Sequence, residues 1–195
     1  MNALGIFNCL LCEDKLDLDI ISIQKYAYNL MRTTEGRAHS NMGGWQSGFV
    51  DNDQELSLLV LEINKRLEGL RSIINFNDNL VLKVESMWIN INPTYSYNTR
   101  HIHPGSYMSG SFYVKTPNNS GTLMLKHPAL NSMYILRSRD IFKTYNEVNS
   151  AAWSIPPVEN KLVMFPGWVE HEVSQNLSGE DRISIAFNTT FYERN

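Results

Sequence analysis

The hydrophobic pattern of the sequence changes near residue 78, and this change limits the folds that the chain can adopt. Before it, apolar residues recur at helical spacing over 17–31 and 53–70, with Asp51 or Asp53 available to cap the second helix. After it come short segments rich in β-branched and aromatic residues and separated by Gly, Pro and Asn. These segments are 80–91, 109–114, 121–127, 161–166 and 182–192. Many short strands with turns between them indicate a β-sandwich or barrel rather than a parallel α/β sheet.

The length of 195 residues favours one domain, 1–195, with a sizeable core. We expect a helical part over about 14–72 and a β core over about 80–192. The segment RAHSNMGGWQSGFV, residues 37–50, is rich in glycine and too irregular for a helix or a strand. Residues 127–157 are long and weakly periodic, and loops of that size are often functional, so we expect a lid there.

Composition and charge argue against several classes of protein. The net charge is −3 without a basic block, so a nucleic-acid partner is not expected. No apolar stretch approaches the ~18 residues of a membrane span, and the N-terminus does not resemble a signal peptide. The two cysteines, Cys9 and Cys12, predict free thiols in a reducing cytoplasm, although the sequence gives no role for the pair.

A motif with two histidines, RHIHPG, interrupts the β-rich part of the chain at residues 100–105. On an extended backbone, residues i and i+2 face the same side, so His101 and His103 can point at one divalent metal. Pro104 and Gly105 would end that strand and expose the pair at its tip. Taken alone, the pattern is weak, because most His-x-His pairs bind no metal.

A second group of polar residues lies far along the chain, in MFPGWVEHEVSQN (164–176) and RISIAFN (182–188). His171 follows a turn, and in the last segment apolar residues alternate with polar ones. Arg182 and Ser184 share the polar face, where a guanidinium suits a bidentate grip on a carboxylate. An outer face exposed to solvent would produce the same alternation, so this strand alone leaves both interpretations open.

Taken together, the chain resembles the non-haem iron, 2-oxoglutarate-dependent oxygenases, and most of all a small branch with four ordered motifs. They appear here as SNMGGWQS (40–47), HIHPGSYMSGSFYV (101–114), MFPGWVEHEVSQN (164–176) and RISIAFN (182–188). The resemblance implies a mostly β fold, a double-stranded β-helix (jelly roll, cupin-like) with the N-terminal helices packed on one sheet. It also implies Fe(II) and 2-oxoglutarate as cofactors.

The resemblance assigns roles to individual residues. His101 would be the first metal ligand and His171 the distal one. Arg182 and Ser184 would hold the distal carboxylate of 2-oxoglutarate, with Tyr113 as a further contact. The expected activity is hydroxylation of a C–H bond, with release of succinate and CO2.

The chain departs from the family pattern at His103. Most members use two histidines and one carboxylate, and here an imidazole takes the place of that carboxylate. His103 is either a third ligand or an outer-shell residue with water in its place; a carboxylate such as Glu85 or Glu170 is a further option. We expect direct ligation by His103.

Two rival functions remain at this point. A three-histidine, cupin-like dioxygenase would oxidise its substrate without 2-oxoglutarate. A non-catalytic jelly-roll module would have a binding or structural role and no enzymatic activity. The primary substrate is not given by the sequence, and the oligomeric state stays open, a homodimer included. Among the remaining residues, we interpret Trp45 and Trp168 as core or cavity wall, and His39 and His127 as solvated or structural.

Overall fold

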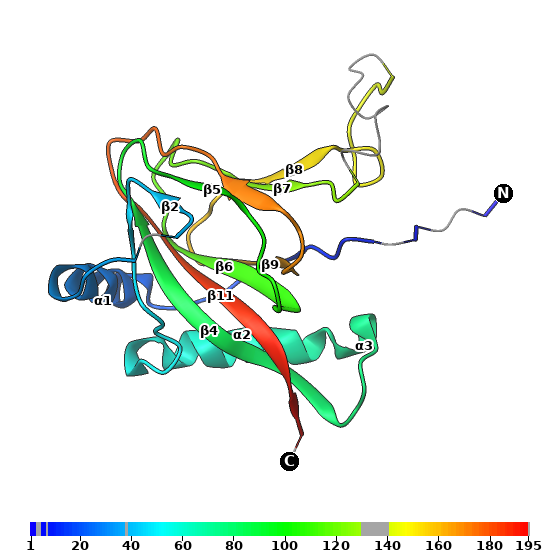
Figure 1. Cartoon of the computed structure of the whole chain (residues 1–195), viewed down its shortest axis with the longest axis horizontal. Helices are drawn as coiled ribbons and strands as arrows, with labels where there is room; N and C mark the ends of the chain where they lie inside the picture. Colours follow the sequence, from blue (N-terminus) through cyan, green and yellow to red (C-terminus); the bar gives the residue numbers. More distant parts are fainter. Residues whose placement is uncertain (3–4, 7, 38, 130–140, 195) are drawn as a thin grey trace.

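The computed structural model describes residues 1–2, 5–6, 8–37, 39–129 and 141–194. Its strands form two sheets that face each other, which gives the expected jelly roll (Figure 1). Within the described residues, the larger sheet has the order β1 Cys12–Lys15, β9 Lys161–Pro166, β6 Met108–Lys115, β11 Arg182–Glu193, β4 Leu80–Asn92, β3 Trp45–Gln46. The smaller sheet has the order β2 Asn41–Met42, β5 Tyr97–His101, β10 His171–Val173, β7 Leu123–Lys126, β8 Ala152–Ile155.

Strand β11 lies inside the larger sheet, antiparallel to both β4 and β6. Its apolar residues Ile183, Ile185 and Phe187 are fully buried in the main hydrophobic core. Because successive side chains of a strand point to opposite faces, Arg182 and Ser184 face the space between the sheets. The polar face of this strand is therefore an inner face and not a solvated one.

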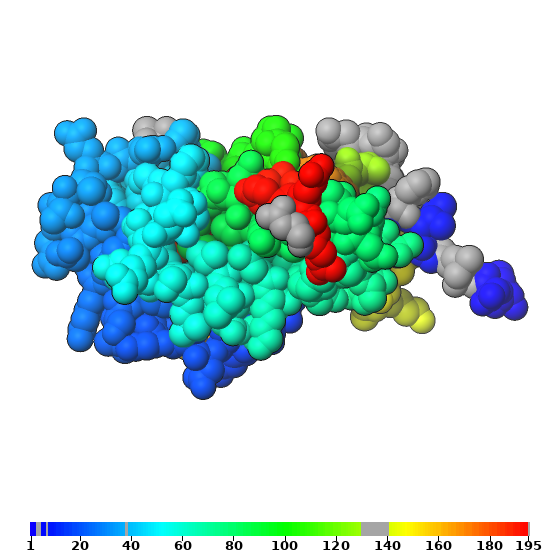
Figure 2. All heavy atoms as spheres, turned by 90° about the horizontal axis from the view of Figure 1, so that it is seen from below, coloured from blue at the N-terminus to red at the C-terminus, as the bar shows by residue number. Residues whose placement is uncertain are grey.

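The helices cover the outer face of the larger sheet (Figures 1 and 2). Helix α1, Ile20–Thr33, begins where the carboxylate of Asp19 accepts a hydrogen bond from the backbone N–H of Ser22 at 3.1 Å. Helix α2, Ser57–Gly69, buries one stripe of residues at a spacing of four. That stripe is Leu59, Ile63 and Leu67. The short helices are η1 Gln54–Leu56 and α3 Arg71–Ile74.

The five predicted strands are present with bounds close to those expected, and so are the two predicted helices. Two details differ. Asp53 precedes η1 without capping it, because its carboxylate accepts a hydrogen bond from the Tyr26 hydroxyl. The irregular segment 37–50 contains two short strands, β2 and β3, which exist because they pair with β5 and β4.

The predicted lid, 127–157, falls partly outside the described residues, since 130–140 are not among them. Ala152–Ile155 form the edge strand β8 rather than a loop. No described residue of the segment lines either of the two cavities that contain His101 and His103. The lid therefore stays a prediction.

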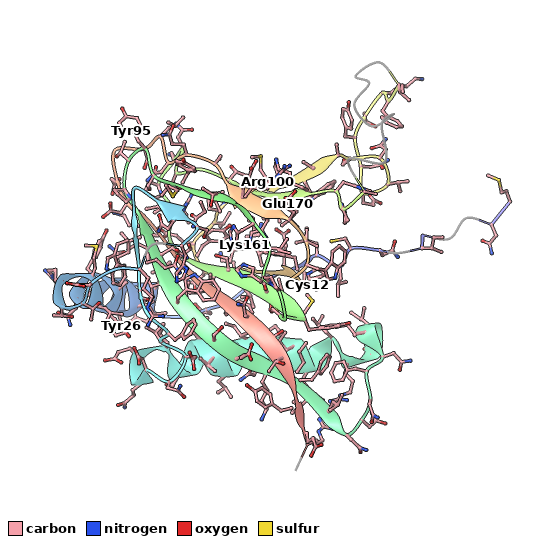
Figure 3. All side chains as sticks on the ribbon, in the orientation of Figure 1. Cys12, Tyr26, Tyr95, Arg100, Lys161 and Glu170 are labelled. Atoms are coloured by element: carbon pink, nitrogen blue, oxygen red, sulfur yellow. The ribbon has the colours of Figure 1, made fainter. Side chains whose placement is uncertain are left out.

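Cys9 and Cys12 are free, as expected, and burial raises the pKa of both thiols. Cys12 lies at the start of β1, which pairs with β9 at the edge of the larger sheet (Figure 3). Across the described residues, every helix is too short or too polar to cross a membrane.

The packing of β6 against its neighbours generates a prediction about Gly110. A Cβ at this position would overlap the Phe187 ring and the Val163 carbonyl oxygen, neither of which is free to move. We expect Gly110→Ala to lower the free energy of unfolding by about 1–3 kcal/mol through overpacking. Gly179→Ala is the control, because a Cβ there meets nothing within 4 Å. Urea titration measures both variants, and equal stabilities would contradict the packing described here.

Candidate active site

Three histidines from two distant parts of the chain, around residues 101–103 and 171, meet between the two sheets. His101 and His171 are direct partners in the antiparallel pairing of β5 with β10. Their ring centroids lie 4.3 Å apart, and the ring of His103 lies 5.0 Å from each. One ligand nitrogen from each of the three residues lies within 4.8 Å of the other two.

Backbone carbonyls fix the orientation of two of the rings. His101 Nδ1 lies 2.6 Å from the Thr99 oxygen, and His171 Nδ1 lies 2.9 Å from the Val169 oxygen. In both rings the Nδ1–H donates to a backbone carbonyl oxygen, which leaves the lone pair on Nε2 for a metal. This arrangement is typical of metal-binding histidines.

The environment keeps the imidazoles neutral, as metal ligation requires. Burial, with the neighbouring imidazoles, lowers the pKa of His103 to about 3. The same two causes lower the pKa of His171 to about 4, and burial also lowers the pKa of His101. Three uncharged donors therefore face one another at neutral pH.

The distance between two of the donors fits a divalent first-row metal. Two ligands ~2.1 Å from such an ion and at right angles to each other are ~3 Å apart. His103 Nε2 and His171 Nε2 are 3.2 Å apart. Imidazole nitrogen is a suitable donor for iron, so the residues present fit the metal.

His103 lies two residues beyond the end of strand β5, at the start of the turn that contains Pro104 and Gly105. Strand β5 ends at His101. The turn is held from the other side, because the backbone N–H of His103 donates to the Gly167 oxygen at 2.8 Å and the Gly167 N–H donates to the Tyr107 oxygen at 3.2 Å. The FPGW turn thus positions a histidine that lies more than 60 residues away.

No Asp or Glu of the described residues belongs to this group. Glu170, just before β10, instead pairs with Arg100 of β5 at 3.1 Å (Figure 3). Glu172 pairs with Lys126 at 2.6 Å, and Glu85 is exposed. The described structure therefore offers His103, and no carboxylate, as the third donor.

Arg182 lies buried in the same space, with 1% of its surface exposed. Its Nη1 donates to the Ser120 oxygen at 2.6 Å, and its Nη2 donates to Asn98 Oδ1 at 3.4 Å. Burial lowers the pKa of Arg182 to about 10, so the guanidinium is still charged at neutral pH. None of the ion pairs among the described residues involves it.

Two further donors flank the guanidinium. Ser184 lies two residues after Arg182 on the same face of β11. Tyr113 on β6 is the register partner of Ser184. Burial raises the pKa of Tyr113 to about 12, so its phenol remains a neutral hydrogen-bond donor. A carboxylate placed here would meet one cation and two hydroxyl groups.

One cavity between the sheets, here named the inner cavity, contains all six residues that the sequence singled out. Its lining residues are Ser40, Trp88, Asn90, Asn98, His101, His103, Gly110, Ser111, Tyr113, Leu123, Phe165, His171, Val173, Arg182, Ser184 and Ala186. The imidazoles and the guanidinium thus line one shared cavity.

A model of the family described as "Putative 2OG-Fe(II) oxygenase" matches residues 86–188, more than half of the chain. The chain belongs to this family of oxygenases. Fe(II) and 2-oxoglutarate are accordingly its cofactors. A search of curated proteins finds no match.

Solved structures of other oxygenases share the fold. A prolyl-4-hydroxylase from Pseudomonas putida has a TM-score of 0.62 at 15% identity, over 95% of this chain and 93% of that one. HygX from Streptomyces hygroscopicus, with nickel, 2-oxoglutarate and hygromycin B bound, has a TM-score of 0.60 at 10% identity, over 92% and 82%. A prolyl hydroxylase from Trichoplax adhaerens has a TM-score of 0.61 at 16% identity, over 92% and 82%.

Several residues of this oxygenase cavity did not stand out in the sequence. Asn90 lies inside the apolar segment 80–91, and a polar residue in an otherwise buried strand was the signal that could have revealed it. Asn98, which contacts Arg182, gave no such signal, because its strand is short. Trp168 was interpreted wrongly: it is 52% exposed, since the turn that holds His103 points it outward, whereas Trp45 packs against the core.

Proposed function

We propose that His101, His103 and His171 bind Fe(II), and that Arg182 with Ser184 and Tyr113 binds the distal carboxylate of 2-oxoglutarate. In this arrangement the chain, as one oxygenase domain, hydroxylates a C–H bond of a second substrate. The residues that hold metal and cosubstrate belong to one cavity, which supports joint binding.

The observation that carries this proposal is the buried guanidinium of Arg182 without a carboxylate partner. An uncompensated buried charge is costly, and proteins normally pair it. Among the described residues, the guanidinium donates only to a carbonyl oxygen and an amide oxygen. A dianionic ligand that reaches from the imidazoles to Arg182 supplies the missing charge.

Each residue has a distinct part in the proposed reaction. The imidazoles hold the metal on one side, and their uncharged state matches the low pKa values of His103 and His171. Arg182 fixes the far end of the cosubstrate, so that its 2-oxo acid end faces the metal. When bound, Fe(II) would use O2 to couple the decarboxylation of 2-oxoglutarate to hydroxylation of the substrate, with one oxygen atom going to succinate and the other to the hydroxylated product. The enclosed cavity excludes bulk water from this chemistry.

The three-histidine set also fits the rival in which no 2-oxoglutarate takes part. Arg182 distinguishes the two functions, because a reaction without the cosubstrate has no use for a buried cation in the metal cavity. A jelly roll without chemistry would need neither the neutral imidazoles nor the guanidinium. The family match and the unpaired Arg182 together favour the 2-oxoglutarate-dependent reaction.

Removal of the guanidinium tests the cosubstrate site. We expect Arg182→Gln to weaken 2-oxoglutarate binding by at least about 2 kcal/mol, or ~30-fold, since a buried charge contact is lost. Calorimetry on Fe(II)-loaded protein under anaerobic conditions measures the affinity. Arg100→Gln is the matched control. Arg100 lies on strand β5 of the smaller sheet, is half exposed and pairs with Glu170. Equal affinities for both variants, together with succinate production in neither, would favour the rival without 2-oxoglutarate.

Removal of the third imidazole tests the metal site. Loss of an outer-shell partner typically costs ~10–100-fold in metal affinity, so we expect His103→Ala to cost more than this. Anaerobic Fe(II) titration measures the effect, with His127→Ala as control, because His127 is not part of the metal-binding group. Unchanged affinity and turnover in His103→Ala would remove His103 from the ligand set.

A further inference from the structure

A second cavity, here named the outer cavity, adjoins the inner one. Its lining residues are His39, Ser40, Gln46, Phe49, Trp88, Thr99, His101, His103 and Asn188. It shares Ser40, Trp88, His101 and His103 with the inner cavity, but neither Arg182 nor His171 lines it. A molecule in the outer cavity would therefore reach the proposed metal without occupying the place of the cosubstrate.

The wall of the outer cavity is uncharged. Apart from its imidazoles, its described lining contains no acidic or basic side chain. A cation that entered would lose hydration and meet no anionic side chain, which is unfavourable. Positive charge lies close by, because the Arg37 guanidinium is 5.5 Å from the centre of the Phe49 ring. Two aromatic residues, Trp88 and Phe49, provide flat apolar surface, and Phe49 is largely exposed at the mouth. The cavity is suited to a neutral group with a flat or apolar part.

One polar group in this wall lacks a partner. Gln46 is 93% buried, with 7% of its surface exposed, and its Oε1 has no hydrogen-bond partner among the described residues. Leaving a buried amide oxygen unpaired is unfavourable. A half-turn of the carboxamide exchanges its donor and acceptor ends, so either end can face the cavity. One end of the carboxamide is buried and the other can face the cavity, and the end that faces the cavity can hydrogen-bond a ligand.

The SNMGGWQS motif, which metal and cosubstrate leave unexplained, holds Gln46 in place. The Asn41 amide donates to the Trp45 oxygen at 3.1 Å, and Asn92 donates to Asn41 Oδ1 at 2.9 Å. Any side chain at Gly44 would collide with Asn41. On the other side of Gln46, the Ser47 hydroxyl accepts from the Ile89 N–H at 2.9 Å.

Strand pairing determines the direction of the Gln46 side chain. Gln46 is the register partner of Asn90 on β4, and Asn90 lines the inner cavity. Register partners share a face of the sheet, so Gln46 also faces the space between the sheets. A side chain held this way is preorganised for recognition, because little conformational freedom is lost when it binds.

We propose that the outer cavity binds the primary substrate through a neutral carboxamide, which pairs with Gln46 while its flat or apolar part lies against Trp88 and Phe49. This inference rests on the proposed function, because it takes the metal to lie at His101 and His103. A carboxamide carries both a donor and an acceptor, so it can pair with whichever end of the Gln46 side chain faces the cavity. Gln46 is then the residue that determines specificity.

Three probes of the same shape test this proposal: benzamide, benzoate and benzylamine. Each is titrated by calorimetry into protein loaded with Fe(II) and 2-oxoglutarate under anaerobic conditions. We expect benzamide to bind in the range of about 1 mM, as a fragment of its size can. Benzylamine should bind about tenfold more weakly, because no anionic side chain of the cavity pairs with its charge. Benzoate is the anionic comparison, because its carboxylate can contact the metal or Arg37.

The variant Gln46→Glu should reverse the preference, so that benzylamine binds better than benzamide. Gln54→Glu is the matched control, because Gln54 is exposed in η1 and should leave the ranking of the probes unchanged. An unchanged ranking in Gln46→Glu, or no binding of benzamide to the unmodified protein, would overturn the proposal.

Succinate formation without a primary substrate separates this inference from the function on which it rests. This turnover is measured in the unmodified protein and in Gln54→Glu, because Gln54 lines neither cavity. If turnover persists and the probes do not discriminate, only the substrate assignment fails. If the unmodified protein neither binds nor turns over 2-oxoglutarate, the proposed function fails instead.

Discussion

The alternation of side chains along one central strand supports both the fold and the site. Strand β11 buries Ile183, Ile185 and Phe187 against the helices, and it turns Arg182 and Ser184 toward the opposite sheet. A slip of one residue in its register would exchange these two faces, exposing the guanidinium to the apolar core. The pairing with β4 and β6 on both sides prevents this slip. The stability of the core and the position of the charge are therefore set by the same hydrogen bonds.

The three donors proposed for the metal carry no negative charge, and this distinguishes the site from the common two-histidine, one-carboxylate arrangement. Most relatives place one carboxylate beside two imidazoles, whereas the described residues here provide three imidazoles and no carboxylate. In the proposed complex, the negative charge beside Fe(II) comes from 2-oxoglutarate alone. Cosubstrate and metal would then bind cooperatively, since each supplies charge that the other needs.

The sequence predicted those parts of the structure that follow from local periodicity. The long strands β4 and β11 and the helices α1 and α2 carry clear patterns of period 2 or 3.6, and all were found. The alternation in RISIAFN also placed Arg182 and Ser184 on one face correctly. The gathering of the six candidate residues in one cavity came from the resemblance, because no local pattern shows that residues 101 and 171 are neighbours.

The rest depended on contacts between distant segments. Strands of two or three residues, such as β2, β3 and β10, have no periodicity of their own and exist only through pairing. His103 converges on the other imidazoles through the Gly167 carbonyl, which the spacing of the motif does not reveal. Gln46 lies in a segment that seemed irregular, and its unpaired oxygen is visible only in three dimensions.

The account depends on one claim, that the three imidazoles and Arg182 bind one metal and one cosubstrate across the inner cavity. A crystal structure of protein soaked anaerobically with Fe(II) and 2-oxoglutarate tests it most directly. We expect Nε2 atoms of His101, His103 and His171 within ~2.2 Å of the ion, and the distal carboxylate against the Arg182 guanidinium. An ion held elsewhere, or 2-oxoglutarate bound with its carboxylate away from Arg182, would contradict the account.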